Sequence, residues 1–262
     1  MSVDKNGYKW IDVLYNLQSQ STHMKKIIIS TLILAIVISS CDMILGRRVK
    51  GNGHITSEQR SISNAKKIRL SGSYDVELST GATSVKIESD DNIIPYVLTE
   101  EEDGWLVIKS KEMFNLRPTN HIKVFISTDE LDALSIAGSG NIIGKNKFIG
   151  GDKLDLKIAG SGDINLEVNA PKIKSEIAGS GNIIIAGETK DEEIHIAGHG
   201  DYKGDNLKAE NAEVHIAGSG NVKLFADSKL VIHIAGSGSV FYKGNPKIEQ
   251  HVAGSGDIKQ IQ

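Results

Sequence analysis

The sequence predicts an all-β protein, a parallel β-solenoid, and three observations support this prediction. A five-residue phrase, Ile-Ala-Gly-Ser-Gly or a close variant, recurs seven times between Ser135 and Asp257, in steps of 18 to 22 residues. Such a period is typical of a repeat architecture. Around each phrase, apolar and polar residues alternate with a period of two, as in a strand with one buried face. The two glycines of each phrase then end the strand and form a corner, because glycine reaches positive φ without steric cost.

Repeats of about 20 residues suit one turn of a solenoid, in which neighbouring coils stack about 4.8 Å apart. The array therefore predicts about seven regular coils of 18–22 residues, in which equivalent residues form columns along the stack. The first residue of each phrase is apolar, so these residues should form an inward column. Its members are Ile136, Ile158, Ile177, Ile196, Ile216, Ile234 and Val252.

A polar residue follows each phrase and should form a second column, at the corner. Its members are Asn141, Asp163, Asn182, Asp201, Asn221, Ser239 and Asp257. The sequence Gly-Ser-Gly-Asp superficially resembles calcium-binding β-roll repeats, but those repeats need Asp at about nine-residue spacing on both sides of a coil. Here Asp alternates with Asn and occurs once per coil. We therefore interpret the column as a structural ladder of side chains that hydrogen-bond from coil to coil.

Before the array, the chain has the features of a bacterial lipoprotein. Lys25-Lys26, the apolar run 27–38 and Ile38-Ser39-Ser40-Cys41 follow the order of a positive region, a hydrophobic region and a lipobox. The apolar run is too short to span a bilayer comfortably. We therefore predict a lipoprotein signal peptide over residues 24–40 and lipidation of Cys41, which is the only cysteine.

The remaining boundaries follow from composition. Residues 1–23 resemble neither a signal nor a domain, and we interpret them as an extension ahead of the true start at Met24. Residues 41–61 are polar and contain glycine, so they are predicted to form a tether. The β domain is predicted to cover residues 62–262. Its first, less regular segment contains several alternating stretches and should form the first coils that cap the array, since terminal repeats are often atypical.

The residues of this domain resemble those of the head GIN domain family. The phrase and its following Asn/Asp-Ile come after Ser-Gly-x-x-Asp-Val at Ser71–Val76 and after an acidic-Gly-Trp-Leu-Val-Ile hairpin at Asp103–Ile108. The resemblance covers the chain from about Ile62 to the C-terminus. It implies a right-handed parallel β-helix on a secreted or lipid-anchored envelope protein, of a kind common in Bacteroidota and labelled as auto-transporter adhesins. The family pattern supplies no catalytic residues.

Four histidines occupy the position just before the phrase in successive repeats: His195, His215, His233 and His251. The alternation points them outward, one coil apart, and His199 lies at a nearby corner. Imidazoles at this spacing suit either a stacked ladder on a solvated face or the ligands of a divalent metal such as zinc, copper or nickel. The sequence predicts no resident cofactor.

The sequence favours a non-enzymatic function. Polysaccharide-cleaving enzymes need clustered carboxylates on one face, whereas Asp163, Asp201 and Asp257 lie on separate coils and all five arginines precede the array. Exposed aromatic platforms for sugars are not indicated, because Trp10 and Trp105 both lie outside the array. The net charge of −3 gives no sign of a nucleic-acid partner.

These observations predict a lipid-anchored protein of the bacterial cell envelope, at the outer membrane, with an adhesin-like or scaffold role. Its predicted partners are the membrane, through Cys41, and a cell-surface or glycan ligand. The alternative is a metal- or glycan-binding module that uses the outward histidine column, and a polysaccharide-active β-helix enzyme ranks third. The last coil ends at Ile261-Gln262 without an evident cap, which leaves its edge open to pairing with another chain.

Overall fold

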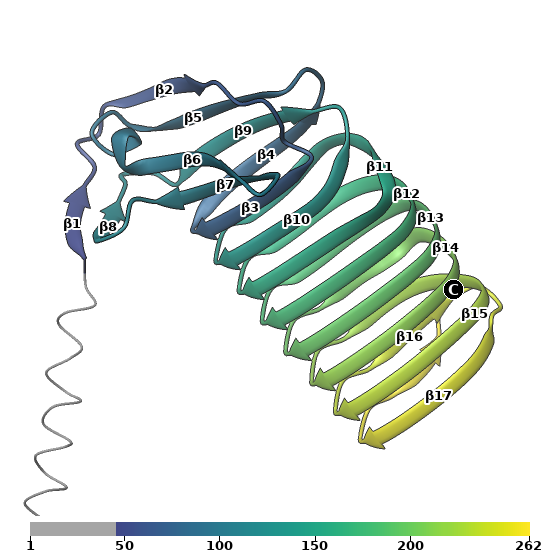
Figure 1. The fold of residues 1–262 in the computed structure, drawn as a ribbon. Helices are drawn as coiled ribbons and strands as arrows, with labels where there is room; N and C mark the ends of the chain where they lie inside the picture. Colours follow the sequence, from purple (N-terminus) through teal and green to yellow (C-terminus); the bar gives the residue numbers. More distant parts are fainter. Residues whose placement is uncertain (1–45) are drawn as a thin grey trace, which may run out of the picture. The chain divides into compact units, whose positions relative to one another are not determined.

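The computed structural model describes residues 46–262, and residues 48–262 form one compact unit. The predicted signal peptide, Cys41 and the first part of the predicted tether lie outside the described residues. Strands dominate the described part of the chain (Figure 1), and η2 (Ile94–Tyr96) is a single short 3-10 turn. Within residues 46–262, no helix is long and apolar enough to cross a membrane.

The C-terminal part is a parallel β-solenoid, as the repeats predicted. Five long strands, β11 to β15, follow one another along the stack, and each pairs in parallel with the next. The register matches the phrases: Ile177 pairs with Ile196, which pairs with Ile216. The strands of this part are β10 (Leu131–Gly138), β11 (Asn141–Gly160), β12 (Asp163–Gly179), β13 (Asn182–Gly198), β14 (Tyr202–Gly218), β15 (Val222–Gly236), β16 (Val240–Lys243), β17 (Lys247–Gly254) and β18 (Ile258–Gln260).

The two glycines of a phrase have different structural roles, as the coil at β13 shows. Gly198 has φ +131°, a backbone conformation that residues other than glycine rarely adopt. A Cβ atom on Gly200 would lie 2.1 Å from the carbonyl oxygen of Gly181 in the preceding coil. A Cβ atom on Gly198 would also lie 2.4 Å from the carbonyl oxygen of Gly179. The first glycine therefore permits both the corner and the close approach of adjacent coils, and the second permits the close approach.

The core fills the interior of the coils. The inward column is buried from Ile136 to Ile234, but Val252 remains 43% exposed. Val252 belongs to β17, which pairs only with β15 among the described strands, so no further coil covers it. Tyr202 and Phe148 are the bulky aromatic residues of the array's interior.

The less regular N-terminal segment extends and then ends the stack. Strand β3 pairs in parallel with β10, so that Gly72 matches Gly138, and β4 pairs in parallel with β11. Strands β7 and β9 add one more parallel layer, and antiparallel β6, β5 and β2 then close this end. The strands are β1 (Arg47–Lys50), β2 (Ile55–Arg60), β3 (Lys67–Gly72), β4 (Tyr74–Thr80), β5 (Ser84–Asp90), β6 (Val97–Glu102), β7 (Trp105–Ser110), β8 (Phe114–Arg117) and β9 (Ile122–Thr128).

The predicted tether over residues 41–61 is wrong from residue 47 onward. Residues 47–50 form β1, which pairs with β8, and residues 55–60 form β2, which pairs antiparallel with β5. Most side chains of β2 are exposed, so no apolar alternation marks this strand in the sequence. It forms because the edge of β5 offers unpaired backbone groups. The predicted boundary at residue 62 therefore lies inside the fold.

Candidate functional site: a groove along the histidine column

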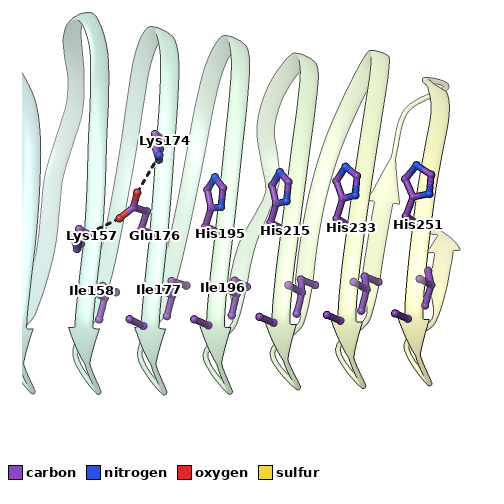
Figure 2. A pocket seen from close by; sticks show the side chains of 18 residues that line it. Lys157, Ile158, Lys174, Glu176, Ile177, His195, Ile196, His215, His233 and His251 are labelled. Carbon is purple, nitrogen blue, oxygen red and sulfur yellow. Dashed lines mark ion pairs between the residues drawn. The ribbon is translucent and has the colours of Figure 1, made fainter.

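The four predicted histidines form a stacked column on the outer face of the solenoid. Strands β13, β14, β15 and β17 each supply one, and the strand registers pair His195, His215, His233 and His251 in sequence. Neighbouring ring centroids lie 4.7, 4.8 and 5.2 Å apart, with interplanar angles of 2°, 10° and 16°. Figure 2 shows the four rings on successive strands. The column follows from the alternation, because His195, His215 and His233 each stand between two buried apolar residues.

A groove with a volume of ≈ 820 Å³ runs beside this column. Two residues after each histidine, the same outer face carries an exposed alanine whose methyl group leaves space next to the imidazole. These alanines are Ala197, Ala217, Ala235 and Ala253. The groove continues toward β12 and β11, where Lys174 and Glu176 of β12 and Lys157 of β11 line it. It therefore presents methyl groups and imidazoles at one end and charged groups at the other.

The charged end is held together by ion pairs. Glu176 lies 3.2 Å from the ammonium of Lys157 and 3.1 Å from that of Lys174 (Figure 2). The hydrogen bond from Lys174 is the largest factor that lowers the pKa of Glu176. Glu193 continues the network, because it contacts His195 at 2.8 Å and Lys174 at 3.2 Å. The hydrogen bond from His195 and the contact with Lys174 lower the pKa of Glu193 to about 2, against the effect of burial.

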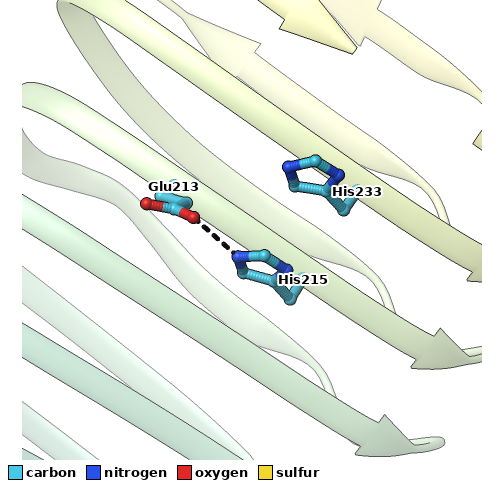
Figure 3. A group of neighbouring side chains, drawn as sticks. All are labelled: Glu213, His215 and His233. Carbon is cyan, nitrogen blue, oxygen red and sulfur yellow. Dashed lines mark hydrogen bonds and ion pairs between the residues drawn. The ribbon is translucent and has the colours of Figure 1, made fainter. Parts of the chain in front are cut away.

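Around His215, on β14, the acidic partner has no lysine paired with it among the described residues, in contrast to Glu193 beside His195. Nε2 of His215 lies 2.8 Å from Oε1 of Glu213, and His233 stands beside His215 on the neighbouring strand (Figure 3). The ligand atoms of Glu213, His215 and His233 all lie within 4.8 Å of one another. Among residues 46–262, no other group of three His, Cys, Asp or Glu side chains meets that separation. The structure places His195, His251 and His199 outside this group.

The corner residues form a continuous chain of hydrogen bonds. Backbone N–H groups donate to the side-chain oxygen of the preceding coil: Asp201 to Asn182 at 3.2 Å, and Asn221 to Asp201 at 2.9 Å. The side-chain amide of Asn221 also donates to Asp201 at 3.2 Å. The same pattern runs from Asp75 through the column Asn141, Asp163, Asn182, Asp201, Asn221, Ser239 and Asp257. These contacts fit a structural role for the column.

Two features of the groove were missed by reasoning from the sequence. The alanine column and the acidic partners Glu193 and Glu213 both lie two residues from a histidine. Since side chains two residues apart share one face of a strand, the period that placed the histidines also signals these neighbours.

The comparisons with known proteins agree with this architecture. A family model described as "Putative auto-transporter adhesin, head GIN domain" matches residues 64–246. The chain belongs to the head GIN domain family. The resemblance seen in the sequence is thereby confirmed, and it indicates an adhesin-like protein of the cell envelope or surface. A comparison with curated proteins gives no match.

Several solved structures similar to this head GIN domain chain come from Parabacteroides and Bacteroides species. A protein of Parabacteroides distasonis ATCC 8503, described as a "Putative lipid binding protein", is 29% identical over 82% of this chain and 100% of its own, with a TM-score of 0.71. A "putative adhesin" of the same strain is 26% identical over 82% and 100%, with a TM-score of 0.66. A "putative adhesin" of Bacteroides fragilis NCTC 9343 is 22% identical over 81% and 100%, with a TM-score of 0.76, and supports the fold alone.

Proposed function

We propose that this head GIN domain chain is a non-enzymatic, lipid-anchored protein of the bacterial cell envelope that holds an extended cell-surface ligand in its groove. The observation that carries the proposal is the continuous groove beside the histidine column, in a family described as adhesins. Because four successive coils repeat the same imidazole and methyl surface, an extended polymer such as a glycan can make several weak contacts at once. Linked weak contacts raise the overall affinity without any single strong contact.

Four carboxylates of the array are held by neighbouring groups, which favours binding over catalysis. Asp163 and Asp201 accept hydrogen bonds in the corner ladder. Glu176 and Glu193 are engaged with lysines, and both have lowered pKa values, so they are stable as carboxylates. A glycosidase needs one carboxylic acid and one carboxylate facing the scissile bond. These side chains instead stabilise the coils.

Filling the groove tests the proposal. Ala197→Arg and Ala217→Arg replace two of the exposed alanines with long side chains that fill the groove. Ser219→Arg puts the same group at the exposed corner and is the matched control. Binding of the full-length chain and its variants is measured on a glycan panel and on intact bacterial cells. We expect the two groove variants to lose at least about tenfold in affinity and the Ser219→Arg variant to match the wild type. Equal binding by all three variants would contradict the groove as the contact surface.

A lipid arm belongs in the same experiment, because a Parabacteroides relative is described as lipid binding. Phospholipid vesicles replace the glycan panel, and co-sedimentation is measured with the same variants. Retention by vesicles that depends on Ala197 and Ala217, without glycan binding, would change the ligand class from polysaccharide to lipid.

A further inference from the structure

We propose that Glu213, His215 and His233 bind one divalent metal ion of the zinc, copper or nickel class. This inference is independent of the lipid anchor and of the adhesin-like function. It rests on the position of three ligand groups on adjacent strands and on the contrast between this coil and its neighbours.

The three side chains converge from two strands. Glu213 and His215 lie two residues apart on the outer face of β14, and their side chains are 2.8 Å apart. His233 is the register partner of His215 on β15, with ring centroids 4.8 Å apart. In Figure 3 the carboxylate of Glu213 faces the ring of His215, and the ring of His233 lies alongside. One carboxylate and two imidazoles therefore lie side by side on one face, with their ligand atoms within 4.8 Å of one another.

The preceding coil does not offer the same ligands. Its carboxylate, Glu193, is held by Lys174 at 3.2 Å and Lys172 at 3.5 Å, in addition to His195. Among the described residues, Glu213 has His215 as its one ion-pair partner. The nearby Lys229 borders the same small depression as Glu213 but pairs with Glu249 at 3.6 Å. A metal at Glu213 would therefore not have to displace a lysine.

The following coil also differs. Two residues before His233 the strand carries Val231, so His233 has no acidic partner at that position of its own strand. The step from His233 to His251 widens to 5.2 Å between ring centroids. The middle of the column is thus the place where two close imidazoles meet a carboxylate without a lysine.

The donor set selects the class of ion. Imidazole nitrogen and carboxylate oxygen suit zinc, copper and nickel, whereas calcium and magnesium prefer all-oxygen sites. Zinc lies about 2.0–2.2 Å from such ligands, so two ligand atoms of one ion are at most about 4 Å apart. The side chain of His215 is 36% exposed. Metal binding requires the stacked rings of His215 and His233 to turn out of their near-parallel arrangement, so that both nitrogen lone pairs point at one ion and the separation of up to 4.8 Å closes. The remaining coordination positions face solvent beside the groove.

Zinc titration tests the site. The full-length chain, without a polyhistidine tag and stripped of metal by a chelator, is titrated with Zn²⁺ in an isothermal calorimeter. We expect one ion per chain, and at least about tenfold weaker binding for His233→Ala and for Glu213→Gln. The control His195→Ala removes a ring of the same column outside the proposed site and should change the affinity by less than about twofold. Ca²⁺ should not bind at the same concentrations.

Other outcomes would overturn the assignment. Absence of zinc binding by the wild type would exclude the site, and an equal loss in His195→Ala and His233→Ala would show diffuse binding along the column. Unchanged affinity in Glu213→Gln would remove the carboxylate from the ligand set. Circular dichroism of each variant in chelator checks its fold, and His233→Gln replaces His233→Ala if that variant unfolds. Co²⁺ absorption of the wild type and His233→Gln reports coordination directly.

Discussion

Glu192 and Tyr202 place a polar contact inside the mainly apolar solenoid. Glu192 is 3% exposed, and the hydroxyl of Tyr202 donates a hydrogen bond to its Oε1. Its other carboxyl oxygen is buried without a hydrogen-bond partner among the described residues. Burial therefore raises the pKa of Glu192 to about 8, despite the hydrogen bond from Tyr202. The side chain is held in its neutral form because a buried, unpaired carboxylate is strongly unfavourable.

This raised pKa predicts how stability depends on pH. Since the folded pKa of Glu192 lies above its unfolded value of 4.5, its contribution to the free energy of unfolding is fully present below about pH 4.5. That contribution is lost as pH rises toward 8, at up to about 1.4 kcal/mol per pH unit. Glu192→Gln is neutral at every pH and should remove this slope. Urea unfolding of both proteins at about pH 5, 6.5 and 8 measures it, and parallel stability profiles would contradict the account.

The corner glycines give a second test at the residue scale. Gly218 has φ +139°, and a Cβ atom there would lie 2.3 Å from the carbonyl oxygen of Gly198. We expect Gly218→Ala to lower the free energy of unfolding by about 2–4 kcal/mol, because the coil must distort to accept the methyl group. The adjacent exposed Ser219→Ala is the matched control and should stay within about 0.5 kcal/mol of wild type. A Gly218→Ala variant as stable as that control would show that the corner tolerates a side chain.

The sequence predicts the residues of the repeat better than it predicts the buried contact between Glu192 and Tyr202. The glycine and isoleucine positions follow from the repeat alone. The contact between Glu192 and Tyr202 does not, because the two residues lie on β13 and β14, on either side of the corner at residues 198–200, and meet only in the folded interior. Alternation places Glu192 inward, but only the structure shows that the hydroxyl of Tyr202 donates a hydrogen bond to it.

Among the elements, the corner ladder shows why Asn and Asp alternate. Each Asn of this column can donate from its amide to an Asp of the preceding coil and accept from the backbone of the next, as Asn182 does with Asp163 and Asp201. A column of aspartates alone would place like charges one coil apart, which is unfavourable. The alternation thus supplies donors and separates charges in one pattern.

Substitutions at Asp201 test the ladder. Asp201→Ala removes the acceptor for the backbone N–H and the side-chain amide of Asn221, and we expect a loss of about 1–3 kcal/mol in the free energy of unfolding. Asp201→Asn keeps an oxygen at the same place and should lose less than about 1 kcal/mol. Chemical denaturation compares the three proteins. Equal stability of the Ala and Asn variants would mean that the ladder contributes little.

The elements also show where prediction from sequence fails. Regular repeats locate β11 to β15 because each coil repeats the same alternation and corner. Strand β2 lacks an apolar face and depends on the edge of β5, a contact between residues distant in sequence. The groove can be predicted from the sequence only in part. Its histidines are visible in the repeat, whereas its charged end depends on pairs such as Glu176 with Lys157 that cross between coils.

For the whole molecule, we propose a lipid on Cys41 and a solenoid whose groove is one long binding surface. The fold and the family are established by the repeats, the strand register and the match over residues 64–246. The side of the membrane on which the solenoid lies depends on export, which the packing of the coils does not determine. An adhesin-like contact requires the groove to be outside the cell, so location tests the function of the entire molecule.

Protease treatment of intact cells, with lysed cells as the control, tests most directly whether the solenoid lies outside the cell. The readout is a C-terminal tag on the wild-type chain, and Cys41→Ala serves as the variant without a lipid site. We predict that protease removes the tag from intact wild-type cells, while the Cys41→Ala chain is lost from the membrane fraction. Survival of the tag in intact cells, with loss only after lysis, would place the solenoid inside the envelope and contradict the adhesin-like function.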